Sequence, residues 1–230
     1  MELFADHRPI SHPAAREIIA ILDRGHYVGE AGVEISIAAA QAEAEAGTML
    51  HTPEQLAELR ERERSGGPAT RIEVVHATTQ QAAHALAREA AVVVLNFASA
   101  RNPGGGFPGG AKAQEEELCR CSGLYRALLH APAYYHSNRA QRSLLYTDHA
   151  IHSPRVPFFR LAASEPWLPE PLLLSVITAP APNAGAIARE RPHEAHAIAS
   201  TFERRWANVL AIAEHHGHRA LVLGAWGCGA

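Results

Sequence analysis

The pattern of hydrophobic and polar positions along the chain changes near residue 70. Before that point, apolar residues recur at helical spacing over residues 13–24. Ser11 is the expected N-cap of this segment, Pro13 lies in its first turn and Gly25 directly follows its last residue. These signals predict one amphipathic helix close to the N-terminus.

Three further stretches lie between this helix and the change of pattern. Residues 33–37 alternate between apolar and polar side chains, which predicts a short strand. Residues 38–47 are rich in alanine and glutamate and leave the choice between helix and loop open. A second helix is expected from Thr52 to about residue 64, because Thr-Pro-Glu-Gln is typical of a helix N-terminus.

A linker is predicted at residues 65–68, where the sequence is Ser-Gly-Gly-Pro. We therefore expect residues 1–68 to form an accessory segment that packs on the core, and residues 69–230 to form the core domain. A chain of 230 residues with 47% hydrophobic content can bury one substantial core. One domain with an appendage is favoured over two equal domains.

The core part alternates predicted strands with predicted helices. The expected strands are 71–76, 91–98, 144–151, 172–178 and 220–224, and the expected helices are 79–89, 115–129 and 190–216. Thr79 is the expected cap of the first of these helices. The alternation predicts an α/β fold with a largely parallel or mixed sheet that helices cover on both faces.

A glycine-rich loop follows the most apolar of these strands. It begins with Asn102-Pro-Gly-Gly-Gly-Phe and ends seven residues later at Gln114-Glu115-Glu116, where a helix begins. Three consecutive glycines let the backbone adopt positive φ and approach a ligand closely, and open α/β sheets bind ligands at the carboxyl ends of their strands. A plain turn followed by acidic residues that complement the helix dipole is the structural alternative. A nucleotide P-loop fits poorly, because Lys112 is followed by Ala113 and not by Ser or Thr.

The glycine triplet, its spacer and the Gln-Glu-Glu sequence together closely resemble the signature of bacterial-type poly(ADP-ribose) glycohydrolases, which are macrodomain proteins. A second stretch, residues 221–230, resembles the last core strand and second phosphate loop of that family. The resemblance runs from about Ile72 to the C-terminus and is looser before it. It implies a three-layer α/β/α macrodomain with a mixed central sheet plus an N-terminal accessory helical segment.

The same resemblance implies the function and the site. The activity would be hydrolysis of ribose–ribose O-glycosidic bonds in poly(ADP-ribose), releasing ADP-ribose, with Glu116 as the general acid and Glu115 binding the substrate ribose. Gln114 would orient the loop or a ribose hydroxyl, and Asn102 would bond the ribose next to the scissile bond. The expected ADP-ribose-binding residues are Asn102, Gly104, Gly105, Gly106, Phe107, Gln114, Gly224, Ala225, Trp226, Gly227, Cys228 and Gly229.

Three side chains near this loop have alternative interpretations. Phe107 could pack over the ribose or serve only as a hydrophobic pin for the loop. Asn96 is expected to be a core amide, and Glu117 is expected to be solvated. The second glycine-rich stretch, taken without the first, could also be a plain strand-to-helix turn.

Composition limits the remaining possibilities. The formal charge of −3 gives no electrostatic footprint for direct nucleic-acid binding. No stretch is long and apolar enough to span a bilayer, and the N-terminus does not resemble a signal peptide. The three cysteines, Cys119, Cys121 and Cys228, do not suggest a disulfide framework. We expect a cytoplasmic monomer without membrane contact.

No metal or cofactor is expected. The fifteen histidines include the groups His193/His196 and His215/His216/His218, but no carboxylate or cysteine lies at ligand spacing from them. We expect these histidines to lie on solvated helix surface.

Two other functions stay open at this point. One is removal of single ADP-ribose units from protein or nucleic acid, and the other is ADP-ribose binding without turnover. Members of the resembled family continue beyond the point matched by Ala230 with a phenylalanine-containing turn and a helix. We therefore expect the C-terminal part of the domain, including the aromatic contact to adenine, to be missing from this chain.

Overall fold

The computed structural model describes residues 9–30, 32–62 and 69–228 and contains one central five-stranded sheet. In spatial order its strands are β3 (Met49–His51), β5 (Ala150–Phe158), β6 (Leu172–Pro180), β4 (Val92–Ala98) and β7 (Ala220–Val222). Strand β4 lies parallel to both of its neighbours, β6 and β7, whereas β5 lies antiparallel to β6 and to the edge strand β3. The sheet is therefore mixed, as predicted.

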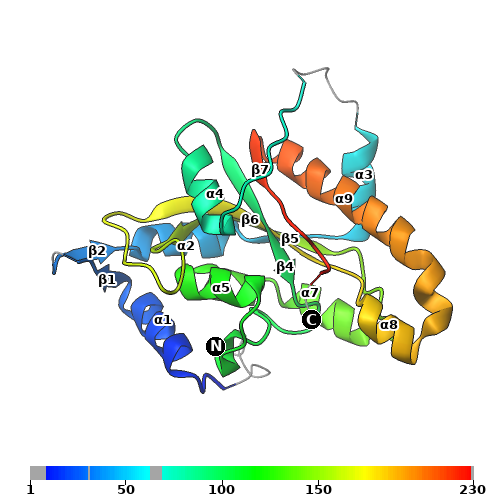
Figure 1. Ribbon diagram of the computed structural model, residues 1–230, viewed down its shortest axis with the longest axis horizontal. Coiled ribbons are helices and arrows are strands. Elements are labelled where there is room, and N and C mark those ends of the chain that lie inside the picture. The colour runs from blue at the N-terminus through cyan, green and yellow to red at the C-terminus, as the bar shows by residue number, and fades with distance from the viewer. Residues whose placement is uncertain (1–8, 31, 63–68, 229–230) are drawn as a thin grey trace.

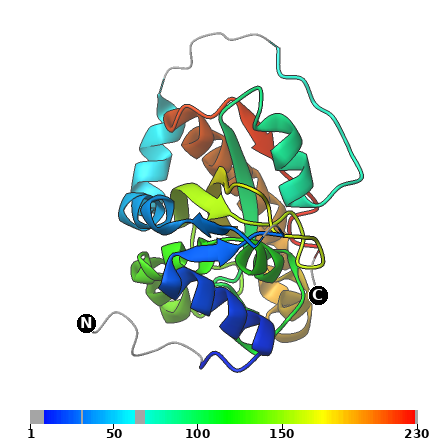
Figure 2. The ribbon, with the colours of Figure 1, turned by 90° about the vertical axis from the view of Figure 1, so that its left-hand side faces the viewer.

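Helices cover both faces of the sheet, which gives three layers (Figures 1 and 2). Alternate residues of β4 point to opposite faces, so Val93 joins the core under α3 and α9, while Val94 joins the core under α1, α4, α5 and α6. The helices are α1 (Pro13–Arg24), α2 (Ala38–Gly47), α3 (Pro53–Glu61), α4 (Thr79–Leu86), α5 (Gln114–Cys121), α6 (Leu124–Leu129), α7 (Pro132–Ala140), α8 (Ala184–Glu190) and α9 (Ile198–His215), with 3-10 turns η1 (Phe107–Gly109) and η2 (Pro192–Ala197).

The predicted helix 190–216 begins only at Ile198, after the 3-10 turn η2, and the predicted helix 115–129 is divided into α5 and α6. Other helix ends lie close to the predicted positions. Helix α1 ends at Gly25, which has φ of +73°, as predicted. Its N-cap is His12 and not Ser11, because the Ser11 hydroxyl donates to Pro108 O instead. Helix α4 is likewise capped one residue earlier than predicted, by Thr78.

Two strand predictions were wrong. Residues 71–76 form no strand, and their apolar side chains are exposed; Val74 is 98% exposed, since no described strand pairs with this segment. Strand β5 starts at Ala150, so most of the predicted strand 144–151 is irregular, and the proline-containing sequence after it is the strand. A register shift between Ser153 and Val156 accommodates this sequence.

The N-terminal segment joins the rest of the fold at several points. Strands β1 (His26–Val28) and β2 (Glu34–Ser36) form a separate two-stranded sheet, but β3 belongs to the central sheet and α3 packs on α9. The predicted linker at 65–68 lies outside the described residues, and the division of the chain at residue 68 stays a prediction. No helix within the described residues is long and apolar enough to cross a membrane.

Candidate active site

Gln114 fixes the start of helix α5 against strand β4. Its side-chain Nε2 donates to Leu95 O over 2.8 Å, and its Oε1 accepts the N–H of Phe97 over 2.8 Å. The amide therefore continues the hydrogen-bonding pattern of the strand. Because both of these bonds are made to the backbone of β4, Gln114 orients the helix that carries both glutamates.

Glu115 is buried beneath the loop that follows β4, with a side chain only 2% exposed. Its carboxyl group accepts the Ser99 N–H over 2.7 Å and an amide N–H of Asn96 over 3.2 Å. Burial raises the pKa of Glu115 to about 8; the hydrogen bonds from Ser99 and Asn96 oppose this shift, and the nearby Glu116 adds to it. The Glu115 side chain therefore carries a proton at neutral pH.

This raised pKa predicts the alkaline side of the pH–activity profile. If activity requires protonated Glu115, kcat should decline as pH rises above about 8, because the carboxyl group ionises there. The Glu115→Gln variant cannot ionise, so its residual activity should show no such decline. Measurement of kcat between pH 6 and 10 for both proteins tests this, and an identical decline in the two profiles would assign the ionisation to another group.

Glu116 points toward the glycine-rich loop. Its Oε1 accepts the Gly106 N–H over 2.7 Å, and its Oε2 accepts the Ala113 N–H over 3.1 Å at the N-terminus of α5. One carboxyl group thus joins the two ends of the spacer between the glycine triplet and the helix. The side chain is 7% exposed and is the more accessible of the two glutamates.

Both carboxyl groups converge on Gly105. A Cβ atom built at this glycine would lie 2.4 Å from Glu116 Oε1 and 2.9 Å from Glu115 Oε2, closer than any real Cβ contact. Gly104 and Gly105 also have φ of +64° and +58°, and Asn102 O accepts the Gly105 N–H over 3.0 Å. Only glycine at position 105 combines this backbone conformation with such close approach to two carboxyl groups.

Asn96 belongs to the same network, which sequence reasoning missed. Its side chain is fully buried, as expected for a core amide, but it donates to both Glu115 Oε1 and Thr178 Oγ1. Its Oδ1 has no hydrogen-bond partner. A polar residue inside the apolar run of β4 was the available signal that this position faces something other than the core.

Two predictions about side chains near the loop need correction. Phe107 is fully buried and packs on Tyr125 with ring centroids 5.1 Å apart, so it pins the loop from below and offers no surface to a ribose. Glu117 is not solvated. It is half-buried, accepts the Ala163 N–H over 2.6 Å and forms an ion pair with Arg120 at 3.0 Å.

The second glycine-rich loop lies beside the first, because β7 and β4 are parallel neighbours. Gly224 approaches the end of β4 closely; a Cβ there would lie 2.9 Å from Phe97 Cζ. Ala225, Gly227 and Cys228 are exposed along the loop, and the Cys228 N–H donates to Ala225 O over 3.2 Å. The structure therefore brings the two predicted loops together at one edge of the sheet.

Trp226, predicted to bind the ligand, has a different position. Its indole is 5% exposed and packs edge-on against Trp206 and Phe202, with centroid distances of 4.9 and 5.6 Å. The side chain anchors the second loop to α9, so only its backbone is available to a ligand. Gly229, also predicted to bind, lies outside the described residues.

A buried arginine organises the irregular segment that precedes β5 at the same edge. Arg205 of α9 is 1% exposed, and its guanidinium donates to the last residue of β6 and to three consecutive carbonyls before β5. Burial lowers the pKa of Arg205, and the ion pair with Asp148 opposes that shift. Its hydrogen-bond acceptors are Pro180 O, Leu145 O, Tyr146 O, Thr147 O and Asp148 Oδ1.

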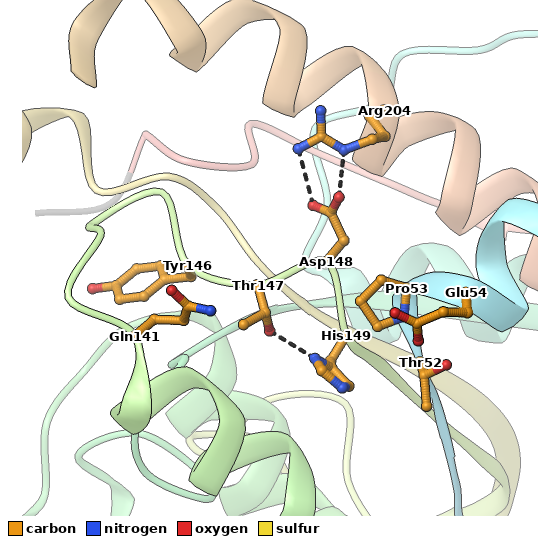
Figure 3. Close-up of a pocket in the computed structure, with 9 residues that line it drawn as sticks. All are labelled: Thr52, Pro53, Glu54, Gln141, Tyr146, Thr147, Asp148, His149 and Arg204. Carbon is orange, nitrogen blue, oxygen red and sulfur yellow. Dashed lines mark hydrogen bonds and ion pairs between the residues drawn. The ribbon is translucent and has the colours of Figure 1, made fainter. Parts of the chain in front are cut away.

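This segment forms one wall of an open cavity of about 510 Å³, separate from the two glycine-rich loops (Figure 3). Asp148 bonds Arg204 across the top of the cavity, and Thr147 Oγ1 lies 2.9 Å from His149 Nδ1. The cavity contains neither glutamate of the site. Its lining residues are Thr52, Pro53, Glu54, Gln141, Tyr146, Thr147, Asp148, His149 and Arg204.

Potential metal ligands are not gathered at the site. Within the described part of the chain, no group of three or more His, Cys, Asp or Glu side chains is arranged to hold a metal ion. His193, His196 and His215 are exposed, as predicted for solvated helix surface. His216 and His218 are half-buried against other histidines, so for these two residues that prediction was wrong.

A mixed sheet between two helical layers, with two glycine-rich loops at the carboxyl ends of adjacent strands, defines a macrodomain-like α/β protein. Residues 15–161 match the family described as the microbial-type PARG catalytic domain, where PARG stands for poly(ADP-ribose) glycohydrolase. The chain belongs to this family.

Solved structures agree with the family match. The PARG of Thermomonospora curvata is 48% identical, with a TM-score of 0.88 over 94% of this chain and 79% of its own. Its complex with the inhibitor ADP-HPD is 47% identical, with a TM-score of 0.86 over 94% and 78%. The PARG of Deinococcus radiodurans in complex with ADP-ribose is 49% identical, with a TM-score of 0.77 over 82% and 76%. Comparison with curated proteins gives no significant match.

Proposed function

We propose that this protein hydrolyses the ribose–ribose O-glycosidic bonds of poly(ADP-ribose) and releases ADP-ribose. The observation that carries the proposal is the convergence of the Glu115 and Glu116 carboxyl groups on Gly105, inside the loop that would hold the ligand. Membership of the microbial-type PARG family supports the same reaction. The two glycine-rich loops lie where the diphosphate of ADP-ribose would find backbone N–H donors.

The two glutamates have different roles in the proposed reaction. Glycosidic cleavage needs an acid that protonates the leaving ribose oxygen, and a water that adds to the anomeric carbon. Glu116, the more accessible carboxyl group, donates that proton and later receives one from the attacking water. Glu115 stays protonated beneath the loop and binds hydroxyls of the ribose.

Glu115 is the alternative acid, and one observation favours it. Burial holds its pKa near 8, so it carries a transferable proton at neutral pH. The two assignments differ in which glutamine variant loses turnover.

The substrate would be poly(ADP-ribose) or an ADP-ribosylated macromolecule, and the product ADP-ribose. Backbone atoms of Gly104 and Gly227 would hold the diphosphate, and Asn102 would contact the ribose at the scissile bond. Gly106 could join them only through other backbone atoms, because its N–H bonds Glu116. We further propose a cytoplasmic monomer that does not bind nucleic acid directly and uses no cofactor.

A polymer assay tests this function against its alternatives. Purified protein should shorten radiolabelled poly(ADP-ribose) and release ADP-ribose, and should leave mono-ADP-ribosylated protein unchanged. The opposite preference would indicate a mono-ADP-ribosyl hydrolase. Binding of ADP-ribose without turnover of either substrate would indicate a non-catalytic binding module.

Thermal unfolding gives an independent test of the ligand. ADP-ribose should raise Tm, because binding to the native state stabilises it, and at equal concentration AMP should raise Tm much less. Equal shifts with the two ligands would contradict a site that holds the second phosphate and the distal ribose. The solvent-matched protein without nucleotide is the control.

A further inference from the structure

Five histidines meet on the side of the sheet where helix α9 ends. His51 comes from β3, His152 from β5, His215 and His216 from the end of α9, and His218 from the turn before β7. His51 and His152 are 5% and 3% exposed, and His216 and His218 are half-buried. The candidate active site does not use any of these side chains.

The rings form two hydrogen-bonded pairs that stack on each other. His51 Nε2 lies 3.2 Å from His216 Nε2, and His152 Nε2 lies 3.1 Å from His218 Nε2. The His152 and His216 rings are parallel within 7°, with centroids 3.7 Å apart. Each Nε2 contact requires one nitrogen with a proton and one without, because two N–H groups cannot bond each other.

Neighbouring ionisable groups disfavour added protons on His152 and His216. The ionisable groups that shift the pKa of His152 and His216 are all histidines, and Arg62 Nη1 lies 3.3 Å from His215 Nδ1. Glu214 and Arg219 are the charged residues next to the cluster in sequence. A proton on the accepting Nε2 of either pair would turn two N–H groups toward each other about one hydrogen-bond length apart.

We propose that His51, His152, His215, His216 and His218 form an acid-sensitive latch that holds the end of α9 and the start of β7 on the sheet. At neutral pH the rings are neutral and the two pairs are intact. The intact pairs exclude further protons, so acid weakens this hold by favouring the unfolded chain, whose histidines take up protons. A backbone bond from His218 N to Ala213 O connects the latch to α9, and a bond from Arg219 N to Ala91 O joins the residue before β7 to the residue before β4.

The sign of the pH effect follows from the histidine pKa values. Burial, followed by the neighbouring histidines, lowers the pKa of His152 to about 2 and of His216 to about 4. Histidine in the unfolded chain has a pKa of about 6.5, so below that pH the unfolded chain binds protons that the folded chain excludes. The latch therefore stabilises the fold above about pH 6.5, and this contribution is lost progressively as pH falls.

The latch would also affect the site, and this part rests on the proposed function. β7 leads directly into the second glycine-rich loop, so loss of the latch would loosen one wall of the diphosphate site. ADP-ribose affinity should then be lower in His216→Gln than in the wild type. The stability effect itself does not depend on what the protein binds.

Tm measurements at pH 7.5 and 5.5 on the wild-type chain and on His216→Gln test the latch. The raised pKa of Glu115 acts in the opposite direction over this range, so the informative quantity is the difference between the two proteins. Wild type should lose about 3–5 °C more than His216→Gln on going to pH 5.5. His193→Gln, at an exposed histidine outside the cluster, is the matched control and should behave like wild type.

Two further results would overturn the proposal. One is an equal acid-induced loss of Tm in wild type and His216→Gln. The other is a Tm increase with Zn²⁺ at pH 7.5 that disappears in His216→Gln, which would make the cluster a metal site. Imidazole NMR titration of the wild type keeps the test independent of how the variant folds. His152 and His216 should stay neutral at pH 5.5, and titration of both rings near the unperturbed pKa of about 6.5 would contradict the latch.

Discussion

Replacement of Glu116 by Gln is expected to lower turnover of poly(ADP-ribose) by about two to four orders of magnitude, the usual contribution of a general acid. The variant should fold normally. The single carbonyl oxygen of Gln can still accept one of the two N–H groups that bond Glu116, such as that of Ala113, and Gln is as suitable as Glu at this position of a helix N-terminus. ADP-ribose affinity should change little, because backbone N–H groups hold the diphosphate.

Glu115→Gln is the matched variant, since it removes the neighbouring carboxyl group of the same helix. It should lose less turnover and more ADP-ribose affinity than Glu116→Gln, because Glu115 is proposed to bind ribose hydroxyls. A general loss of fold or of helix-dipole complementarity would affect both variants alike. Single-turnover kinetics and calorimetric affinity should be measured for both. Near-normal turnover in Glu116→Gln combined with a large loss in Glu115→Gln would make Glu115 the acid, in keeping with its raised pKa.

Replacement of Gly105 by Ala is expected to abolish most of the activity without unfolding the protein. The added Cβ would lie 2.4 Å from Glu116 Oε1 and 2.9 Å from Glu115 Oε2, and the backbone would have to keep φ of +58°. Carboxyl groups at the ends of flexible side chains can move aside, so the strain should displace both groups while the core stays intact. Turnover should fall about 100-fold or more, since a displacement of about 1 Å at a reacting group can cost that much.

Gly109→Ala is the control for this prediction. Gly109 lies in the same loop, but a Cβ there meets no atom within 4 Å, and its φ is not positive. Its turnover and Tm should match those of wild type. If Gly105→Ala keeps wild-type turnover, the two carboxyl groups do not act from the positions seen next to Gly105. If both variants lose activity equally, the loop tolerates no side chain and Gly105 has no special role.

Much of this site was readable from local sequence. A glycine triplet after an apolar strand predicts a loop at the carboxyl edge of a sheet, and Gln-Glu-Glu predicts the first turn of the next helix. Both expectations depend on short-range properties, namely missing Cβ atoms and helix N-terminal preferences, and the structure confirms both in β4, Gly104, Gly105 and α5. The capping residues of α3 and α4 are local in the same sense and were predicted to within one residue.

The roles of individual side chains depended on contacts between residues far apart in sequence. The sequence left open whether Phe107 contacts the ligand or pins the loop, and it predicted that Trp226 contacts the ligand. Tyr125 packs on the buried Phe107 and Trp206 on the buried Trp226, and neither partner is suggested by the sequence around the loops. Glu117 was expected in solvent because the resemblance gives it no role. It instead accepts a backbone N–H from Ala163, 46 residues further along the chain, and pairs with Arg120.

The sequence by itself determined the local elements of the protein: where glycine permits positive φ, where helices begin and which strands are apolar enough to be buried. Only the tertiary structure decided which of these elements meet. Alternation alone could not form a strand at residues 71–76, because a strand requires a neighbour to pair with its backbone. The histidine latch was equally invisible, since β3, β5 and α9 bring its members together from positions up to 167 residues apart. The pKa of Glu115 likewise arises from burial, which depends on the packed fold and not on the residues beside it in sequence.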